Sequence, residues 1–348
     1  MTNKTTFGDL HIGPSFTPFV IAELSGNHKG DLNRALKLID AAADAGVQAV
    51  KLQTYTADTI TMPGVYRIED PNSLWYGRDL YDLYQEAFTP WEWHEALFRH
   101  AESKGLICFS SPFDETAVDF LEGLGSRLYK IASFENTHFP LIRKVIGTGK
   151  PLIISTGVID WPELDKTMEF VRREGAAEVA LLKCTSDYPA DPADSNLLAI
   201  PRLTERYHTL AGLSDHTLGI GVAIASVALG ACIIEKHITL DRSEGGVDAA
   251  FSLEPHEFAQ MMKELNDAWR ARGIPELVSD LKKLKSSVFK RSFYAAKNIL
   301  KGEIISEENV RVIRPAMGIP ASDFEKVYGA TANIDIPSGT ALKYEFLK

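Results

Sequence analysis

Short apolar runs rich in β-branched residues alternate with amphipathic helical segments along most of the chain, from residue 19 to about residue 271. This alternation predicts parallel strands joined by helices, because each buried strand needs a helix to cover it. Eight repeats favour an α/β fold of the closed (β/α)8 TIM-barrel type over an open doubly wound sheet, which usually has fewer strands and a phosphate-binding glycine loop. No such loop follows the first run. The predicted strands are Phe19–Leu24, Ala49–Gln53, Ile107–Ser110, Leu128–Ile131, Leu152–Ser155, Val179–Lys183, Leu210–Ser214 and Ile233–His237.

The pattern changes after Trp269, where a charged helical connector leads to a segment with short strands and almost no helical periodicity. We therefore predict a barrel domain over residues 1–275, a linker over 276–286 and a small second domain over 287–348. A domain of about 60 residues has a marginal core, so we expect it to lean on another surface, from its own chain or from a partner.

The connection between residues 54 and 90 is longer than the ~12–15 residues usual for a structureless loop. It carries many aromatic residues, which are Tyr66, Trp75, Tyr76, Tyr81 and Tyr84, together with Arg78. Two interpretations stay open. The segment is a lid or wall of a substrate pocket, or it is an Ω-loop or short helix that packs on the barrel rim.

The charge and cysteine content exclude several classes of partner. The chain of 348 residues has a formal net charge of −10 without a long basic run, which argues against nucleic acid and acidic membranes. Cys108, Cys184 and Cys232 are few and odd in number, which fits reduced thiols. Because there is neither a signal-peptide pattern nor an uncharged run of membrane-spanning length, we expect a cytoplasmic protein with no membrane partner.

Polar residues recur where the predicted strands end, and the C-terminal strand ends carry the chemistry in barrels of this type. Side chains two positions apart share one face of a strand, so Lys51 and Gln53 can both point inward, as can Glu235 and His237. The sequence therefore predicts an active site at this end of the barrel. The strand-end polar residues are Glu23, Lys51, Gln53, Ser110, Ser111, Lys130, Ser133, Ser155, Lys183, Thr185, Ser214, Asp215, His216, Glu235 and His237.

His216 and His237 end two neighbouring predicted strands, close enough to share one ion while leaving positions open for water or substrate oxygens. We interpret them as ligands of an open, catalytic metal site. The alternative is two hydrogen-bonded core histidines without a metal. Because only two imidazoles and no thiolate are expected nearby, a divalent cation such as Mn²⁺ or Mg²⁺ is favoured over a structural zinc.

Lys51 and Lys130 lie on separate predicted strands and can jointly hold a phosphate or carboxylate, assisted by nearby serine hydroxyls. A buried strand lysine can instead pair with Glu23 or Glu235 as a purely structural ion pair. A third interpretation is Schiff-base chemistry, with Lys51, Lys130 or Lys183 as the nucleophile.

Several stretches of the predicted barrel closely resemble the sialic acid synthase family, and the resemblance covers nearly the whole chain. The tail, from about residue 287 through RPAMGIP at 314–320, resembles the family's antifreeze-like SAF domain, a small β-clip fold. The resemblance implies a TIM barrel followed by a SAF domain, and a transferase that condenses phosphoenolpyruvate with an acetamido sugar. The barrel stretches are FVIAELSGNHKGDLNRALKLIDAAADAGVQAVKLQTYTADT (from residue 19), SSPFDETAVDFL (110), YKIASFENTH (129), LLKCTSDYPA (181), GLSDHTLGI (212) and EKHITLDRSEGGVDAAFSLEP (235).

The same resemblance implies roles for single residues and a partner. His216 and His237 would hold the divalent metal ion, with Mn²⁺ expected before Mg²⁺ or Co²⁺, and Glu23 and Glu135 would act near the reacting centre. In the family the SAF domain reaches the partner's barrel, which implies a domain-swapped homodimer. The implied phosphoenolpyruvate contacts are Lys51, Lys130, Ser133, Ser186 and Ser214. The implied sugar contacts are Gln53, Tyr188, Asp248 and Arg314.

Within the family, the motifs LSGNH, KLQTY, SFENTH and KCTSDYP resemble the pseudaminic acid branch, whose acceptor is 2,4-diacetamido-2,4,6-trideoxy-β-L-altropyranose. N-Acetylneuraminate synthases more often carry IGINH, KHQTH, SAECNN and HCTNxYP. N-Acetylneuraminate or legionaminic acid synthesis is the nearest alternative. From other classes, the tail alone is compatible with a carbohydrate- or ice-binding module, and the lysines are compatible with a Schiff-base aldolase. The resemblance also suggests that the product serves surface glycans or flagellin.

Overall fold

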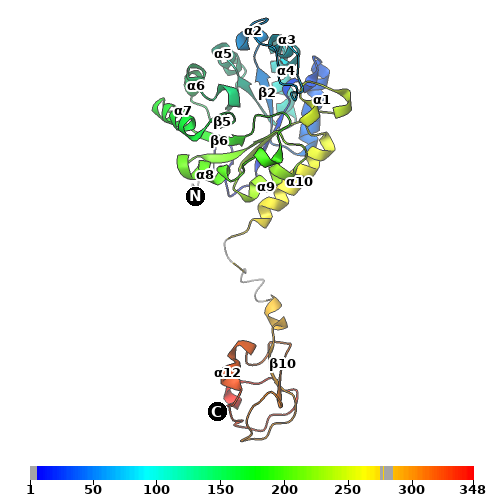
Figure 1. The fold of residues 1–348 in the computed structure, drawn as a ribbon, viewed down its shortest axis with the longest axis vertical. Helices are drawn as coiled ribbons and strands as arrows, with labels where there is room; N and C mark the ends of the chain where they lie inside the picture. The colour runs from blue at the N-terminus through cyan, green and yellow to red at the C-terminus, as the bar shows by residue number, and fades with distance from the viewer. Residues whose placement is uncertain (1–5, 275–276, 278–284) are drawn as a thin grey trace. The chain divides into compact units, whose positions relative to one another are not determined.

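The computed structural model describes residues 6–274, 277 and 285–348, and the chain divides into two compact units, residues 1–273 and 274–348 (Figure 1). Most of the predicted linker, 276–286, lies outside the described residues. Among the residues that are described, no helix has the length and apolar character needed to span a membrane.

The first unit is a closed barrel of eight parallel strands, as predicted, and each strand pairs with the next one along the chain. The ring closes where β1 pairs with β8, in a register that places Glu23 opposite His237. All eight apolar runs thus form strands, because each is buried between the barrel interior and a covering helix. The strands are β1 (Phe19–Glu23), β2 (Ala49–Thr54), β3 (Ile107–Pro112), β4 (Tyr129–Ile131), β5 (Leu152–Ser155), β6 (Val179–Cys184), β7 (Leu210–Asp215) and β8 (Ile233–His237).

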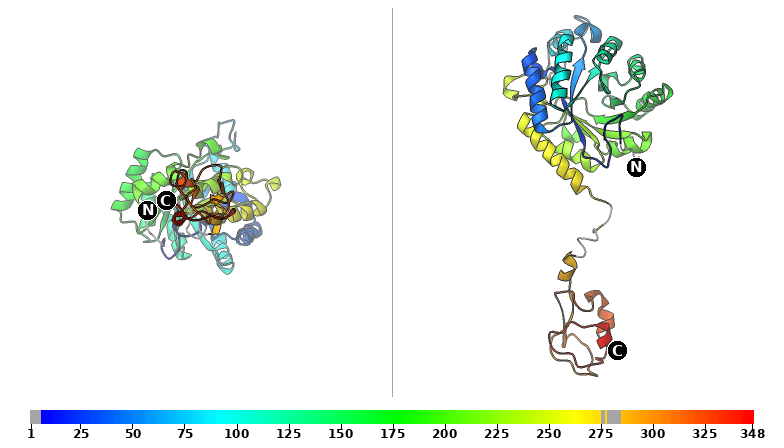
Figure 2. Two further views of the ribbon diagram at one scale, coloured as in Figure 1. Left: turned by 90° about the horizontal axis from the view of Figure 1, so that it is seen from below. Right: turned by 180° about the vertical axis from the view of Figure 1, so that it is seen from behind.

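Helices surround this barrel (Figure 2). The first of them begins where the Asp31 carboxylate accepts a hydrogen bond from the Asn33 N–H, and it ends at Gly46, whose φ of 85° is left-handed. Its buried face packs on the strands through small and aliphatic side chains at helical spacing. The covering helices are α1 (Leu32–Ala45), α4 (His94–Ser103), α5 (Glu115–Gly123), α6 (Phe139–Ile146), α7 (Trp161–Arg173), α8 (Ala199–Tyr207), α9 (Gly221–Ala228) and α10 (Pro255–Ala271).

Apolar side chains fill the layer between the strands and the covering helices, and also one end of the barrel interior. The larger cluster lies between strands and helices, and a second cluster fills the barrel interior. Phe7 and Ile12, from the segment before β1, are buried in this second cluster with strand residues such as Phe109 and Leu182. The N-terminal end is therefore plugged by apolar groups, so the polar strand-end residues gather at the opposite end.

The long connection after β2 forms two helices, α2 (Ala57–Ile60) and α3 (Leu80–Ala87). It is anchored to the loop after β8, since Trp75 Nε1 donates a hydrogen bond of 2.9 Å to the carbonyl of Val247. Tyr66, Trp75 and Tyr84 line the cavity described below. The segment is thus a wall of that cavity, which was one of the two interpretations of the sequence.

The second unit contains a two-stranded antiparallel sheet, in which β9 (Ser292–Ala295) pairs with β10 (Val310–Ile313), and a short helix, α12 (Phe324–Val327). Gly302 and Gly339 take left-handed φ values of 89° and 84° at the two predicted turns. Its own core is small and includes Phe293 and Leu342. Several apolar side chains of this unit stay exposed, among them Met317 at 70%.

Candidate active site

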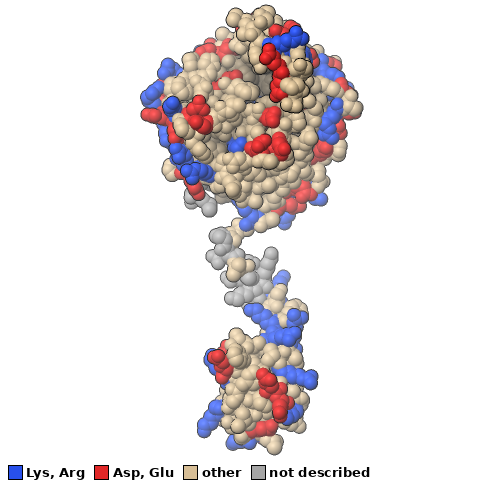
Figure 3. All heavy atoms as spheres, in the orientation of Figure 1, with Lys and Arg blue, Asp and Glu red and all other residues tan. Residues whose placement is uncertain are grey.

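A cavity of about 790 Å³ opens among the C-terminal strand ends and their loops. On the visible outer face of the barrel unit, basic and acidic side chains are interspersed (Figure 3). The cavity brings together most of the predicted site residues, but Glu135 does not line it and Arg314 is an exposed residue of the second unit. The predicted residues that line it are Glu23, Lys51, Gln53, Lys130, Ser133, Ser186, Tyr188, Ser214, His216, His237 and Asp248.

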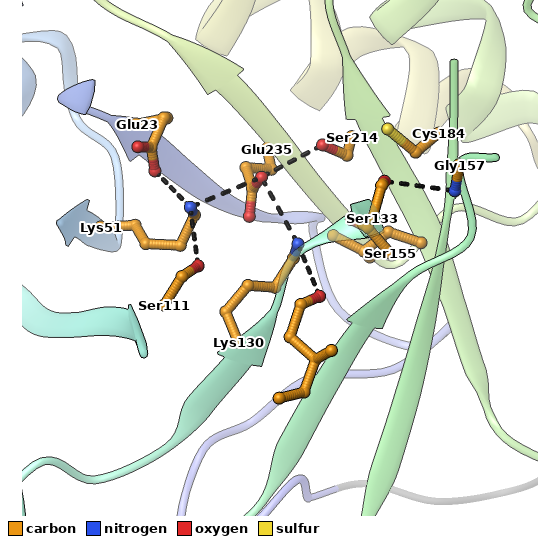
Figure 4. Close-up of polar contacts among 12 residues, drawn as sticks. Glu23, Lys51, Ser111, Lys130, Ser133, Ser155, Gly157, Cys184, Ser214 and Glu235 are labelled. Atoms are coloured by element: carbon orange, nitrogen blue, oxygen red, sulfur yellow. Dashed lines mark hydrogen bonds and ion pairs between the residues drawn. The ribbon is translucent and has the colours of Figure 1, made fainter. Parts of the chain in front are cut away.

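Four buried charged side chains form a cluster across the strand ends (Figure 4). Lys51 Nζ lies 2.5 Å from Glu23 Oε2 and 3.9 Å from Glu235 Oε1. Lys130 Nζ lies 3.8 Å from the same Glu235 oxygen. The Ser214 hydroxyl donates to Glu235 at 3.1 Å. Lys51 thus has the carboxylate partner that one interpretation of the sequence gave it, whereas Lys130 has only a distant one.

The electrostatics of the two lysines differ although both are buried. Burial lowers the pKa of Lys51, but the Glu23 and Glu235 carboxylates outweigh it and hold that pKa above its ordinary value. For Lys130, burial dominates and the charge of Lys51 adds to it, so its pKa is lowered. The positive charge of Lys130 is therefore the less compensated of the two, and an anionic ligand beside it would offset this deficit.

His216 and His237 stand at the ends of neighbouring strands with ring centroids 5.3 Å apart. His216 Nδ1 lies 2.8 Å from the Thr185 carbonyl oxygen, so Nδ1 donates and leaves Nε2 free. His237 Nδ1 is buried without a hydrogen-bond partner, and burial followed by the charge of His216 lowers the pKa of His237 well below its ordinary value. An unpartnered neutral imidazole does not fit a satisfied core histidine; it fits a metal ligand.

The donor set around the two histidines is compatible with one divalent cation. In the described part of the chain, no group of three or more His, Cys, Asp or Glu side chains is arranged to hold a metal by itself. Two imidazoles with cavity space beside them match an open site in which water or substrate supplies the other ligands. The acceptor oxygens of Asp248, 3.9 Å from His237 Nδ1, lie next to this site.

Cys184 corrects the expectation that no thiol lies near the histidines. Its Sγ is 3.9 Å from His216 Nδ1, and the side chain lines the cavity. Burial raises the pKa of this thiol, but His216, Ser133 and Lys130 outweigh burial and bring the pKa to about 6. The register that places Cys184 beside Ser214 explains the proximity, whereas the sequence alone indicates only a reduced thiol at this position.

A group of serine hydroxyls lines the cavity together with Lys130. The Ser133 hydroxyl accepts a hydrogen bond of 3.2 Å from the Gly157 N–H, and a Cβ at residue 157 would clash with the hydroxyls of both Ser133 and Ser186. The Ser155 hydroxyl is buried without a partner and lines the cavity. Ser155 is a predicted strand-end residue but not a predicted substrate contact; an unsatisfied buried hydroxyl in a cavity that Lys130 also lines fits an anion contact.

A third group of polar residues lies toward the loop after β8. The Ser25 hydroxyl donates to the Asp248 carboxylate, and the Ser25 N–H donates to Glu23 Oε1 at 3.1 Å. Ser25, which sequence reasoning missed, has a φ of 44°, an unfavourable value for a residue with a side chain. The ring of Tyr188 lies 4.5 Å from that of His216. Outside the cavity lining, Glu135 Oε2 is buried without a partner, and burial raises the pKa of Glu135 to about 7.

Comparison with known proteins agrees with this geometry. The NeuB family model matches residues 38–276, and the SAF domain model matches residues 290–348. The chain belongs to the NeuB family. The resemblance read from the sequence is therefore confirmed, both for the barrel and for the SAF domain, and so is the prediction of an enzyme of this family.

Individual NeuB relatives cover nearly the whole chain. A pseudaminic acid synthase of Campylobacter jejuni is 44% identical over 93% of this chain and 95% of its own length. An N,N'-diacetyllegionaminic acid synthase of Legionella pneumophila is 35% identical over 100% of this chain and 99% of its own length. The structure of an N-acetylneuraminic acid synthetase from Leptospira borgpetersenii superposes with a TM-score of 0.73 at 31% identity, covering 81% of this chain and 94% of that one.

Proposed function

We propose that this NeuB-family protein is a pseudaminic acid synthase, which condenses phosphoenolpyruvate, 2,4-diacetamido-2,4,6-trideoxy-β-L-altropyranose and water into pseudaminic acid and phosphate. The observation that carries the proposal is one cavity that joins a lysine–serine end to a two-imidazole end. The lysine–serine end suits the phosphate and carboxylate of phosphoenolpyruvate, and the two-imidazole end suits the carbonyl of a sugar. The choice of sugar rests on the 44% identity to the Campylobacter enzyme.

In this proposal Lys51 and Lys130 hold the two anionic groups of phosphoenolpyruvate. Lys130 carries the less compensated charge, so the phosphate would bind beside it with the hydroxyls of Ser133 and Ser155. Ser186 and Ser214 line the same cavity and would complete the contacts. An anion bound beside Lys130 would compensate a positive charge whose nearest carboxylate oxygen is 3.8 Å away.

His216 and His237 would hold a divalent cation, and we propose Mn²⁺, with Mg²⁺ and Co²⁺ as the alternatives to compare. When bound, such an ion supplies positive charge to the oxygen of the sugar aldehyde. The protein's own part is to orient both imidazoles. The Thr185 carbonyl accepts a hydrogen bond from His216 Nδ1 and so leaves Nε2 free, and burial keeps His237 neutral.

The methylene carbon of phosphoenolpyruvate attacks the open-chain aldehyde, which leaves positive character on the enol carbon. Water adds to that carbon, and the resulting tetrahedral carbon expels phosphate by carbon–oxygen cleavage. We propose Glu135, whose pKa burial raises to about 7, as the group that takes the proton of this water; because Glu135 does not line the cavity, Glu23, which does, is the alternative base. Glu23, paired with Lys51, would orient the water.

The acceptor sugar would contact Gln53, Tyr188 and Asp248 in the cavity. Arg314 would come from the SAF domain of a second copy in a homodimer, a proposal supported by the small core and the exposed apolar side chains of the second unit. Loss of acceptor affinity in Arg314→Ala, and of dimer formation after removal of residues 287–348, would support it. Full activity of that truncated chain would contradict it.

We further propose that the enzyme works in the cytoplasm and supplies surface glycans or flagellin.

The deciding experiment is phosphate release by the purified chain with Mn²⁺, phosphoenolpyruvate and each candidate acceptor. We expect turnover with the altro-configured diacetamido sugar and a product mass that equals its condensation product. Turnover with N-acetylmannosamine or the legionaminic precursor, together with none for the altro sugar, would contradict the sugar assignment.

A Schiff-base aldolase is the second candidate, and the lowered pKa of Lys130 is the observation that favours it. Lys183 is a weaker candidate for the nucleophile. Its ammonium donates a hydrogen bond of 2.8 Å to the Cys184 carbonyl, and the residue does not line the cavity. Borohydride trapping of the substrate, with activity unaffected by chelators, would favour the aldolase over the synthase.

A further inference from the structure

One wall of the active-site cavity is apolar. Its six side chains are Ile68, Trp75, Leu80, Leu83, Ala87 and Val247, and all of them line the cavity. They form a cluster of their own, separate from the clusters that fill the barrel. We call this set the apolar wall. It stands in a cavity whose other groups are mostly charged or hydroxyl-bearing, so its composition needs an explanation in terms of the ligand.

The apolar wall adjoins the sugar end of the cavity. Val247 directly precedes Asp248, whose carboxylate is 3.9 Å from His237 Nδ1. The Trp75 ring lies 5.7 Å from that of Tyr188, and Tyr188 in turn lies 4.5 Å from His216. Asp248 and Tyr188 therefore stand between the wall and the two histidines. A sugar with its aldehyde carbon at the histidines would extend its far carbons toward the wall.

The wall offers no free hydrogen-bonding side chain. Five of its six members are aliphatic, and the sixth, Trp75, already donates its only polar hydrogen to the Val247 carbonyl at 2.9 Å. The surface is also tightly packed, because a Cβ at Gly26 would meet Val247 Cγ2 and the Ala87 backbone. A ligand hydroxyl that contacts these six side chains alone would be buried without a partner, at a cost of about 1–3 kcal/mol.

We propose that the apolar wall binds the methyl end of the acceptor and selects a 6-deoxy sugar, with a C6 methyl group, against one with a C6 hydroxymethyl group. This inference rests on the proposed function, in which C1 reacts at the histidines and C6 is the carbon farthest from them. The wall replaces water around the methyl group and leaves an added hydroxyl unpaired.

The test compares two acceptors of identical configuration and acetamido substitution that differ only at C6, as methyl or hydroxymethyl. The quantity measured is kcat/KM for each acceptor, from phosphoenolpyruvate-dependent phosphate release. A hydrophobic pocket discriminates against one added hydroxyl by about 10- to 100-fold, so we expect the wild-type ratio in this range, in favour of the deoxy sugar.

A near-isosteric double variant, Val247→Thr with Ala87→Ser, adds two hydroxyls to the wall while keeping its shape. We expect it to lower the preference for the deoxy sugar by about 10-fold and to leave the KM for phosphoenolpyruvate unchanged. Val171→Thr is the matched control, because Val171 is also buried but lies on α7, in the layer between strands and helices. It should leave the preference unchanged. Should the double variant fail to fold, Leu80→Gln at a half-buried position provides the same test.

If the wild-type kcat/KM values for the two acceptors were nearly equal, with clear turnover of both, the inference would be overturned and the proposed function would stay intact. An unchanged preference in a folded wall variant would have the same consequence. No phosphate release with either acceptor would contradict the proposed function itself, and the inference with it.

Discussion

The two faces of β7 and β8 bury polar groups in opposite ways. On the outer face, the ammonium of Lys236 is fully buried and bonds to the Asp215 carboxylate and the Thr217 carbonyl, both at 2.7 Å. On the inner face, Glu235 Oε2 and His237 Nδ1 are equally buried yet have no hydrogen-bond partner. Neighbouring residues of the same strands thus alternate between completed and incomplete networks.

We propose that this contrast separates structural polar groups from functional ones. An unpaired buried polar atom costs free energy, so a stable fold keeps it only where something else can complete it. The outer pair is complete within the chain itself. The inner groups face the cavity, where substrate and cation would complete them, so they contribute binding capacity at the expense of stability.

The strongest test of this contrast removes an inner imidazole. In His216→Ala or His237→Ala, we expect phosphate release to fall about 1,000-fold or more and Mn²⁺ binding, followed by electron paramagnetic resonance, to be lost. His256→Ala is the control, because this histidine is 76% exposed and outside the cavity. Normal turnover and cation binding in either inner variant would remove the basis of the proposed metal site.

Removal of an outer charge should act on stability instead. Lys236→Met leaves the Asp215 carboxylate buried without its cation, so we expect the free energy of unfolding to fall by about 3–5 kcal/mol in urea denaturation. The double variant Lys236→Met/Asp215→Asn removes that lone charge and should recover part of the loss. A Lys236→Met protein as stable as wild type would contradict the structural assignment of this pair.

The pH dependence of stability tests buried groups elsewhere outside the cavity. Burial lowers the pKa of both His28 and His94 to about 4, and neither lines the cavity. The unfolded chain takes up these protons first as the pH falls, so stability is full above about pH 6.5 and declines toward pH 4. For His94 alone the loss is roughly 3 kcal/mol. We expect His94→Gln to flatten this decline in urea unfolding measured from pH 7 to 4; an unchanged slope would exclude His94 as its source.

Lys130→Met gives the inner counterpart of the Lys236 variant. Because Lys130 is buried with only a distant carboxylate, we expect its loss to change the free energy of unfolding by less than about 1 kcal/mol. Catalytic efficiency should fall about 100-fold through a higher KM for phosphoenolpyruvate. A destabilisation as large as that of Lys236→Met would mean that the two faces do not differ as described.

Ser25 combines a strained backbone with a hydroxyl that contacts Asp248, so the two features can be tested at one residue. Ser25→Gly removes the strain of a left-handed φ and should stabilise the fold by about 1 kcal/mol, whereas Ser25→Ala keeps the strain. Both lose the hydroxyl that holds Asp248, so both should raise the acceptor KM by about 10-fold without affecting phosphoenolpyruvate. If the two variants had equal thermal stability, the Ser25 backbone would not be strained. If the acceptor KM were unchanged, the Ser25 hydroxyl would not position Asp248.

Much of the cavity lining was predictable because strand ends are recognisable in sequence. Apolar runs with period and length typical of buried strands located the barrel, and polar residues at their ends identified Lys51, Lys130, His216 and His237 as candidates. The motifs then assigned the family. Cys184 also stood at a strand end, but its nearness to His216 depends on the register between β6 and β7, which no local pattern encodes.

By itself, the sequence determined the succession of strands and helices, the family and the strand-end residues, since these depend on local periodicity and on motifs of neighbouring residues. Only the tertiary structure decided which groups remain unpaired and which distant segments meet. The contact between Ser25 and Asp248 joins residues 223 positions apart, and the apolar wall joins the segment before α4 to the loop after β8. Burial, register and strain arise when the barrel closes, because they depend on every neighbour of a side chain.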